Sequence, residues 1–267
     1  TGNPYVRTPN LDRLASEGTL FTRHISSNTI CMPSRASLFT GLYPPGHNVW
    51  TNGIPLNRRE YNHANQQSIG ERVCSEPPTA ADIFARAGYD TAAFGKLHLT
   101  PNLAPVEYGF PETWACWQDG RFDDWHGPYY GFQHVEMTQG HGEQPCHLGH
   151  YALWLQQMHP EVYEAVGRNA REAERPVPQL NDLYPSAIPA ELHNTTWLAD
   201  RFSAYLGARS GERPFFAFVG FPDPHHPFTP SYDVVREFEG IDVQTAFDSD
   251  GEAAAATPLA NAGTDVS

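Results

Sequence analysis

A predicted helix followed by a predicted apolar strand occurs twice along the chain, and this repeated order limits the folds that the chain can adopt. A predicted helix begins at Thr79 and ends before Gly88, and the apolar segment 89–94 follows it. A second predicted helix, 189–206, leads into the apolar segment 215–221. Helices that alternate with buried strands are typical of a mostly parallel sheet with helices on both faces. We therefore predict an α/β fold whose ligands bind beyond the carboxyl ends of the strands.

The composition predicts a globular chain with an acidic surface. Hydrophobic residues make up 40% of the 267 positions, which is enough for a sizeable core. Thirty-one acidic and seventeen basic side chains give a net charge of -14, which argues against nucleic acid or an anionic membrane as a partner. The longest apolar run, 215–221, is too short for a membrane span. An anionic ligand would therefore need a locally positive pocket.

Cys31 opens the run Cys-Met-Pro-Ser-Arg-Ala-Ser-Leu-Phe-Thr-Gly. We predict a short helix over 35–40 whose first turn, just after Cys31, exposes backbone amides that favour a bound anion. A cysteine-type phosphatase would need His before the cysteine and Arg six positions after it, but Ile30 and Ser37 occupy these positions. The four cysteines show no C-x-x-C spacing, and setting Cys31 aside leaves an odd number, so we expect no disulfide framework.

Lys96 is the only lysine in the chain, and it follows the strand predicted over 89–94 almost directly. A lysine offers a compact ammonium with three rotatable donors, which suits an anionic oxygen. His98 lies two positions further on, so an extended chain would project both side chains to the same side. The positive charge of Lys96 would then lower the pKa of His98. A histidine hydrogen-bonded at a strand end is the alternative interpretation of His98.

Further histidines follow the second apolar segment and occupy a glycine-rich stretch. The run Pro-Asp-Pro-His-His-Pro contains His225 and His226, and its prolines would stiffen the loop that presents them. His47 and Asn52 either line a pocket or stabilise turns. Zinc-ligand side chains also occur at His141, Cys146, His147 and His150. Their spacing matches no zinc finger, so we expect these histidines to face solvent in a flexible loop.

Two long segments lack clear periodicity. Residues 111–185 are rich in Trp, Tyr, Gly, Pro and His, and we expect them to form long loops that shape the substrate pocket rather than a second domain. After Arg236 the chain has seven acidic residues and no Lys or Arg. We therefore predict that 237–267 is an irregular tail.

Three motifs together resemble the type I sulfatases. Cys31, Pro33 and Arg35 match the family's modification signature, and the Gly-Lys-x-His run at 95–98 matches its second motif. His225 stands in a His-x-Pro context similar to that of the family's substrate-binding histidine. The resemblance covers most of the chain and implies an alkaline-phosphatase-like α/β sandwich, with one catalytic domain over 1–267.

The resemblance also implies a modified residue. In this family the motif cysteine is oxidised to formylglycine, whose hydrate carries two hydroxyl groups on one carbon. Modified Cys31 would then be the nucleophile and a metal ligand, and Arg35 would stabilise the hydrate. The expected metal is Ca²⁺, with Mg²⁺ as the alternative. A formylglycine-generating or other sulfatase-maturing enzyme is the implied protein partner.

The remaining roles follow from the same resemblance. Lys96 and His225 would hold the sulfate group and the leaving oxygen, and His226 would be a further substrate-binding residue. His98 would orient or deprotonate the hydrate. One acid or base supplies only a 10²- to 10⁴-fold effect, so the metal and preorganised charges would have to contribute most of the rate enhancement.

The chain departs from the family pattern in its metal ligands. The family's paired aspartates would precede Thr1, and its later Asp-Asn or Asp-His-Gly ligands would follow the His-x-Pro loop. The acidic run 248–251 lacks the buried strand that should introduce such ligands. We therefore expect a sulfatase domain that is incomplete at both ends, with weak metal affinity and little turnover.

The implied function is hydrolysis of a carbohydrate or aryl sulfate ester. Hydrolysis of phosphonate or phosphate esters is the enzymatic alternative, because related enzymes use the same nucleophile. A catalytically dead fragment or binding module is the third possibility. A periplasmic or secreted location is preferred to a cytoplasmic one, and the sequence leaves the esterified alcohol and the oligomeric state open.

Overall fold

The computed structural model describes residues 5–59, 76–143, 148–172, 183–238 and 240. The chain divides into two units, which are described separately. Unit 1 comprises 1–24 and 238–267, and its described helix is α1 (Pro9–Glu17). Unit 2 comprises 25–237 and contains the other described elements. The predicted tail lies outside the described residues except for positions 237, 238 and 240.

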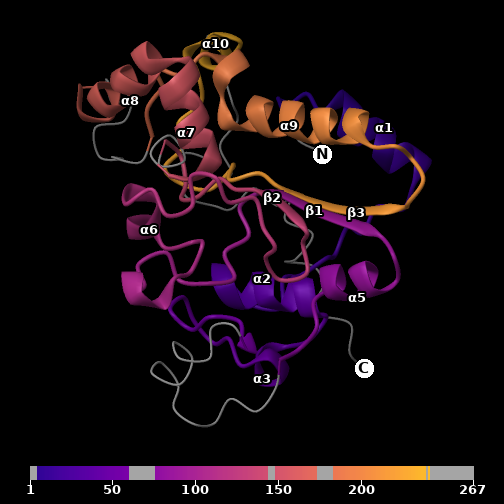
Figure 1. The fold of residues 1–267 in the computed structure, drawn as a ribbon. Coiled ribbons are helices and arrows are strands. Elements are labelled where there is room, and N and C mark those ends of the chain that lie inside the picture. Colours follow the sequence, from indigo (N-terminus) through magenta and orange to yellow (C-terminus); the bar gives the residue numbers. More distant parts are fainter. Residues whose placement is uncertain (1–4, 60–75, 144–147, 173–182, 239, 241–267) are drawn as a thin grey trace, which may run out of the picture. The chain divides into compact units, whose positions relative to one another are not determined.

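Unit 2 is built on a parallel sheet in the order β2 (His134–Glu136), β1 (Asp90–Gly95) and β3 (Phe215–Gly220), shown in Figure 1. β1 and β3 pair from the start, where Asp90 lies opposite Phe215, to the end, where Gly95 lies opposite Gly220. Both apolar segments predicted as strands are strands, and the prediction of a parallel sheet is confirmed.

Helices cover both faces of this sheet. In Figure 1, α2 and α5 lie on one side of the strands and α9 lies on the other. The described helices of unit 2 are α2 (Cys31–Thr40), α3 (Pro44–His47), α5 (Ala80–Arg86), α6 (Trp114–Gln118), α7 (Gly149–Met158), α8 (Pro160–Glu172), α9 (Asn194–Ala208) and α10 (Tyr232–Arg236), with 3₁₀ turns at Val106–Tyr108 and Ala190–Leu192. Among the described helices, none is both long enough and apolar enough to cross a bilayer.

The segment 111–185 is more regular than predicted. Three helices, α6, α7 and α8, and strand β2 lie within it, where we expected long loops. The expectation failed because α7 buries half of its residues, including Tyr151 and Leu155. A helix that is buried on several sides does not show the one-sided apolar period by which a surface helix is recognised.

Alternate residues of β1 contact two separate apolar clusters. Ala93 packs in the cluster that contains Phe39 of α2, whereas Phe94 packs in the cluster that contains Trp197 of α9. The ring of Phe39 also meets Phe218 of β3 edge-on, with 4.8 Å between ring centroids. Burial of apolar surface on both faces therefore holds the sheet between its helices.

Helix α5 begins where its capping residues predict. The side chain of Thr79 accepts a hydrogen bond from the backbone N–H of Asp82, and the Asp82 carboxylate accepts one from the N–H of Thr79. This reciprocal capping box satisfies two amides that a helix start leaves without partners. Gly88 follows the helix with a φ of 88°, a conformation that favours glycine, and turns the chain towards β1.

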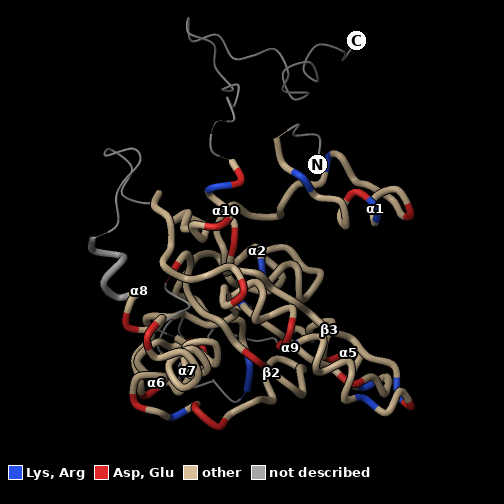
Figure 2. The backbone as a smooth tube through the Cα atoms, turned by 90° about the horizontal axis from the view of Figure 1, so that it is seen from above, with Lys and Arg blue, Asp and Glu red and all other residues tan. Residues whose placement is uncertain are grey.

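Acidic positions recur near α5, α6 and α8 in Figure 2, in keeping with the net charge of -14. They are distributed over several elements of unit 2 rather than gathered in one segment. Two basic residues, Arg35 on α2 and Lys96 after β1, lie within this acidic chain at the carboxyl end of the strand. Their surroundings decide whether they can form a locally positive pocket.

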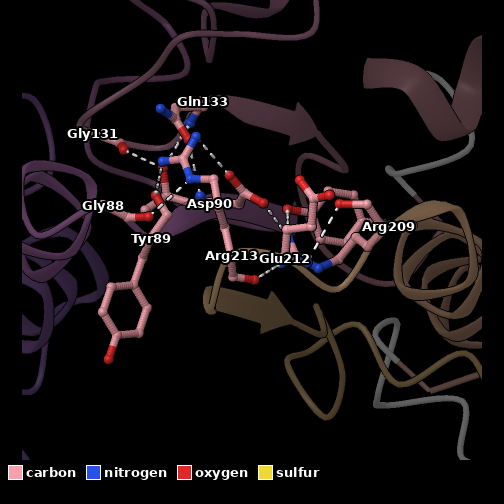
Figure 3. A network of polar contacts seen from close by, with 11 residues as sticks. Gly88, Tyr89, Asp90, Gly131, Gln133, Arg209, Glu212 and Arg213 are labelled. Carbon is pink, nitrogen blue, oxygen red and sulfur yellow. Dashed lines mark hydrogen bonds and ion pairs between the residues drawn. The ribbon is translucent and has the colours of Figure 1, made fainter.

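An ionic network anchors the amino end of β1 (Figure 3). The carboxylate of Asp90 lies 2.7 Å from Nη1 of Arg209 and 3.2 Å from Nη1 of Arg213. Nε of Arg213 also donates to the carbonyl oxygen of Gly88 at 2.9 Å. These contacts join the connection between α9 and β3 to the start of β1, at the end of the strand opposite to Lys96.

The close approach of β1 and β3 at Gly95 yields a stability prediction. Gly95 has a φ of 92°, and a Cβ atom there would clash with the carbonyl oxygen of Gly220. We expect Gly95→Ala to lower the free energy of unfolding by about 2 kcal/mol or more, because the substitution adds both the clash and a strained φ. Urea unfolding followed by circular dichroism measures this change.

Gly207→Ala in α9 is the matched control, because a Cβ atom there meets open space. Its free energy of unfolding should stay within about 1 kcal/mol of the parent protein, or rise, as alanine favours helix. Equal destabilisation by the two substitutions would contradict the importance of the Gly95 contact.

Candidate active site

Cys31 is the first residue of α2, and its side chain is partly exposed. The helix therefore starts earlier than predicted. The N–H of Met32 donates to Oδ1 of Asn52 at 3.0 Å, and the N–H of Ser34 bonds within the first turn. Pro33 has no N–H to offer. The expectation of several exposed amides at this helix start is wrong, and the positive charges described nearby belong to side chains.

Arg35 connects α2 to the end of β1. Its Nη1 donates to the carbonyl oxygen of Lys96 at 2.7 Å. Burial lowers the pKa of Arg35, and the negative charges of Glu112 and of an ionised Cys31 oppose this shift. A guanidinium remains charged in proteins at neutral pH despite such a shift. The contact places a permanent positive charge beside the chain that carries Lys96.

The ammonium group of Lys96 is desolvated and lacks a counterion among the described residues. Lys96 is 3% exposed, and within the described part of the chain its side chain forms neither a hydrogen bond nor an ion pair. Burial, followed by the charge of Arg35, lowers its pKa to about 8, while an ionised Cys31 and Glu112 oppose this shift. A buried ammonium without an anion is costly, so a bound anion would stabilise this arrangement.

His98 lies in the same turn, but it is not placed there by an extended chain. β1 ends at Gly95, and His98 has a φ of 58°, in the left-handed region. The imidazole is 6% exposed, and its Nδ1 has no hydrogen-bond partner among the described residues. Burial, followed by the charge of Lys96, lowers the pKa of His98 to about 3. The predicted direction of this shift is confirmed, whereas the predicted geometry is wrong.

Glu112 holds this turn, and the sequence pattern did not single it out. Its carboxylate accepts hydrogen bonds from the backbone N–H groups of His98, Leu99 at 2.6 Å and Thr100 at 2.9 Å. The hydroxyl of Tyr129 donates to the same carboxylate at 2.8 Å. The sequence did offer one signal for Glu112, which is the single charged residue in the largely apolar run Phe-Pro-Glu-Thr-Trp. A carboxylate in such a run is buried only when hydrogen bonds or charges pair with it, so its position indicates a structural role.

His225 reaches the site together with His141. Their rings stack with 3.6 Å between centroids, and Nδ1 of His225 lies 2.6 Å from the carbonyl oxygen of His226. Burial is the largest cause that lowers the pKa of His225, and the positive charges of Lys96 and Arg35 lower it further. His226 itself is exposed. The structure thus brings His225 near the two cations and adds His141, which we had grouped with zinc ligands.

The other residues considered for zinc do not form a site in the described chain. Cys146 and His147 lie outside the described residues. His150 is buried, with Nδ1 accepting from the N–H of Met137 at 2.8 Å and Nε2 lying 2.6 Å from the carbonyl oxygen of Trp125. His150 is therefore structural, and the expectation that it faces solvent is wrong. Among the described residues, no three or more His, Cys, Asp or Glu side chains form a group that could hold a metal ion.

A cavity of about 460 Å³ opens beside these groups. His98, His141 and Asn52 contribute to its lining, and aromatic side chains such as Trp114 form part of its wall. His47 is instead buried, and its Nε2 lies 2.9 Å from Oγ of Ser37. The cavity therefore joins polar groups of the site to an apolar surface, as small-molecule sites commonly do.

The buried histidines make stability depend on pH. Burial, followed by the charge of His126, lowers the pKa of His150 to about 4, and that of His98 is about 3. An unfolded histidine titrates near 6.5, so below this pH the unfolded chain binds protons that the folded chain does not. We expect the free energy of unfolding to fall as the pH drops from about 6.5 to 4, by up to about 1.4 kcal/mol per pH unit for each histidine.

His150→Asn tests the contribution of one of these groups. The variant should show a shallower pH dependence of the free energy of unfolding between pH 6.5 and 4, measured by urea titrations at several pH values. An unchanged slope would mean that His150 does not stay neutral in the folded chain.

Comparisons with known proteins identify a family. The sequence model described as Sulfatase matches residues 1–253. The multifunctional alkaline phosphatase superfamily protein PehA of Trinickia caryophylli is 33% identical over 85% of this chain and 38% of its own length. N-acetylgalactosamine-6-sulfatase of Canis lupus familiaris is 28% identical over 85% of this chain and 36% of its own length.

A solved structure shows the same relationship. The phosphonate monoester hydrolase of Agrobacterium radiobacter superposes with a TM-score of 0.63 at 28% identity, over 93% of this chain and 42% of that chain. The chain thus spans less than half the length of these relatives. The predicted alkaline-phosphatase-like α/β fold is confirmed.

Proposed function

Since the chain belongs to the sulfatase family, we propose that its protein hydrolyses sulfate esters of a carbohydrate or aryl alcohol. The observation that carries this proposal is Lys96, a buried ammonium without a described hydrogen-bond or ion-pair partner. The anionic sulfate group of an ester would supply the missing countercharge. The guanidinium of Arg35 would add a second positive charge without giving up its bond to the Lys96 carbonyl.

Cys31 is the proposed source of the nucleophile. The family generally uses formylglycine and a divalent metal. When a maturation enzyme has oxidised Cys31, one hydroxyl group of the formylglycine hydrate would attack sulfur while the S–O bond to the alcohol breaks and the alcohol leaves. The second hydroxyl would then lose its proton, and the aldehyde would re-form as the C–O bond to the sulfate breaks. The partial exposure of Cys31 at the start of α2 supports this role, because substrate has to reach the side chain.

The neighbouring side chains would bind the ester and move protons. Lys96 would hold a sulfate oxygen and the leaving oxygen, His225 would bind the same group, and His226 is a further proposed contact. Nδ1 of His98 is positioned as a proton acceptor, since the ring is neutral at neutral pH. A bound anion would balance the charges that lower the pKa of His98 and so make the ring a stronger base.

Calcium remains the proposed metal, with magnesium as the alternative. Formylglycine at position 31 would contribute one oxygen ligand. The described residues do not supply the rest of an oxygen-rich donor set. The roles proposed above for Arg35, Lys96, His98, His225 and His226 do not involve the metal.

Replacing Cys31 tests the nucleophile. In the matured protein, Cys31→Ala should reduce hydrolysis of a sulfate ester by on the order of 10³-fold or more, because alanine cannot be converted to the formylglycine hydrate that would supply the attacking oxygen. Mass analysis of the parent peptide should show the aldehyde in place of the thiol.

Cys116→Ala is the control, because Cys116 is the other described cysteine and is fully buried. Retained activity in Cys31→Ala, or an unmodified thiol in active protein, would contradict the mechanism.

Phosphonate or phosphate ester hydrolysis is the second candidate, supported by the similarity to the phosphonate monoester hydrolase. Turnover of 4-nitrophenyl sulfate, 4-nitrophenyl phosphate and a matched phosphonate monoester separates the two functions. We expect the highest kcat/KM for the sulfate, since the chain also matches the Sulfatase family model and a named sulfatase. Equal or greater turnover of the phosphorus esters would favour the second candidate.

A further inference from the structure

Three consecutive backbone amides converge on one buried carboxylate behind the site. Glu112 is 2% exposed, and it accepts from the N–H groups of His98, Leu99 and Thr100. These amides lie beyond the end of β1, so no neighbouring strand pairs with them in the described sheet. Successive N–H groups that point into one concavity form a nest for an anion, and here a side chain of the same chain occupies it.

The turn needs such a partner because its backbone is otherwise unfavourable. His98 adopts a left-handed φ of 58°, which a residue with a side chain rarely adopts without surrounding constraints. Loss of the carboxylate would leave three buried donors without their acceptor. The turn would then relax, and the side chains of Lys96 and His98 would leave their present positions.

Glu112 also offsets the positive charges of Arg35 and Lys96 without forming an ion pair with the Lys96 ammonium group. Burial raises the pKa of Glu112, but the backbone amides and the Tyr129 hydroxyl that donate to it oppose this shift and favour the ionised carboxylate. In this form its negative charge favours the protonated forms of both Arg35 and Lys96. Yet the Lys96 ammonium forms no ion pair with Glu112, whose described hydrogen-bond donors are backbone amides and two hydroxyl groups. The ammonium thus remains available for an external anion.

We propose that Glu112 is a positioning residue for the site: its carboxylate fixes the turn that presents Lys96 and His98 and balances their positive surroundings from behind. The inference rests on the proposed ester hydrolysis for its catalytic consequence. Its structural part, the dependence of the turn on Glu112, is independent of the substrate.

Glu112→Gln in the matured protein tests the proposal. The glutamine side chain has nearly the same shape, but it has no charge. Its NH₂ group is a donor, and it would face backbone N–H groups that are donors too. We expect kcat for a sulfate ester to fall about 10- to 100-fold, the usual effect of losing a supporting hydrogen-bond partner, with a smaller change in KM. Hydrogen exchange of the amides of residues 98–100 should accelerate, and Glu112→Asp should recover part of both losses.

Glu136→Gln is the matched control. Glu136 is also a buried carboxylate, but it binds Arg201 of α9, with Nη2 of Arg201 at 2.8 Å from Oε1. This variant should keep kcat and the exchange rates of residues 98–100. If Glu112→Gln does not fold, Tyr129→Phe removes one donor to the carboxylate and should produce a smaller change in the same direction.

The outcomes separate this proposal from the proposed function. Unchanged exchange at residues 98–100 in the Glu112 variant, or equal loss of kcat in the Glu136 control, would overturn the positioning role. Accelerated exchange restricted to the Glu112 variants supports it even if the parent protein cleaves no sulfate ester, a result that would overturn only the proposed function.

Discussion

The candidate site depends on the burial of one ammonium group, that of Lys96, away from water. Lys96 is almost fully buried at the end of β1, beside the guanidinium of Arg35. Two cations in a space of low polarity repel each other and lose hydration, so the fold maintains an unfavourable arrangement at this point. An anionic ligand gains from this arrangement, because it replaces the lost water and is attracted by both charges. The net acidity of the chain does not prevent this, since the attraction acts over a few ångströms.

The sheet supports this arrangement by fixing both ends of β1. At the amino end, Asp90 binds two arginines from the connection between α9 and β3. At the carboxyl end, the closeness of Gly95 to Gly220 lets the chain leave the sheet sharply, and Glu112 receives the amides that follow. Apolar clusters on both faces hold the strand between these two ends. Because β1 is held at both ends and on both faces, the position of Lys96, the residue that follows it, is also fixed.

Local signals in the sequence predicted the parts of the fold that local chemistry determines. The capping residue Thr79, the apolar strands and the single lysine at a strand end were visible because each depends on neighbouring positions. Glu112 and His141 were missed as site residues because long-range folding, not spacing, brings them to Lys96 and His225. The amides after Cys31 were misjudged for the same reason, since the side chain that accepts from one of them lies 20 positions away.

The stacked imidazoles of His141 and His225 have a consequence for how this family can vary. The next residue, Gly142, leaves so little room that a Cβ atom would lie 2.6 Å from Cγ of Pro227. Two loops more than eighty positions apart therefore pack directly on each other, and a side chain larger than glycine at 142 would require a shift of Pro227. Across homologues, substitutions at 141 and 142 should be inherited together with substitutions at 225 and 227, so that the pair of loops evolves as a single module.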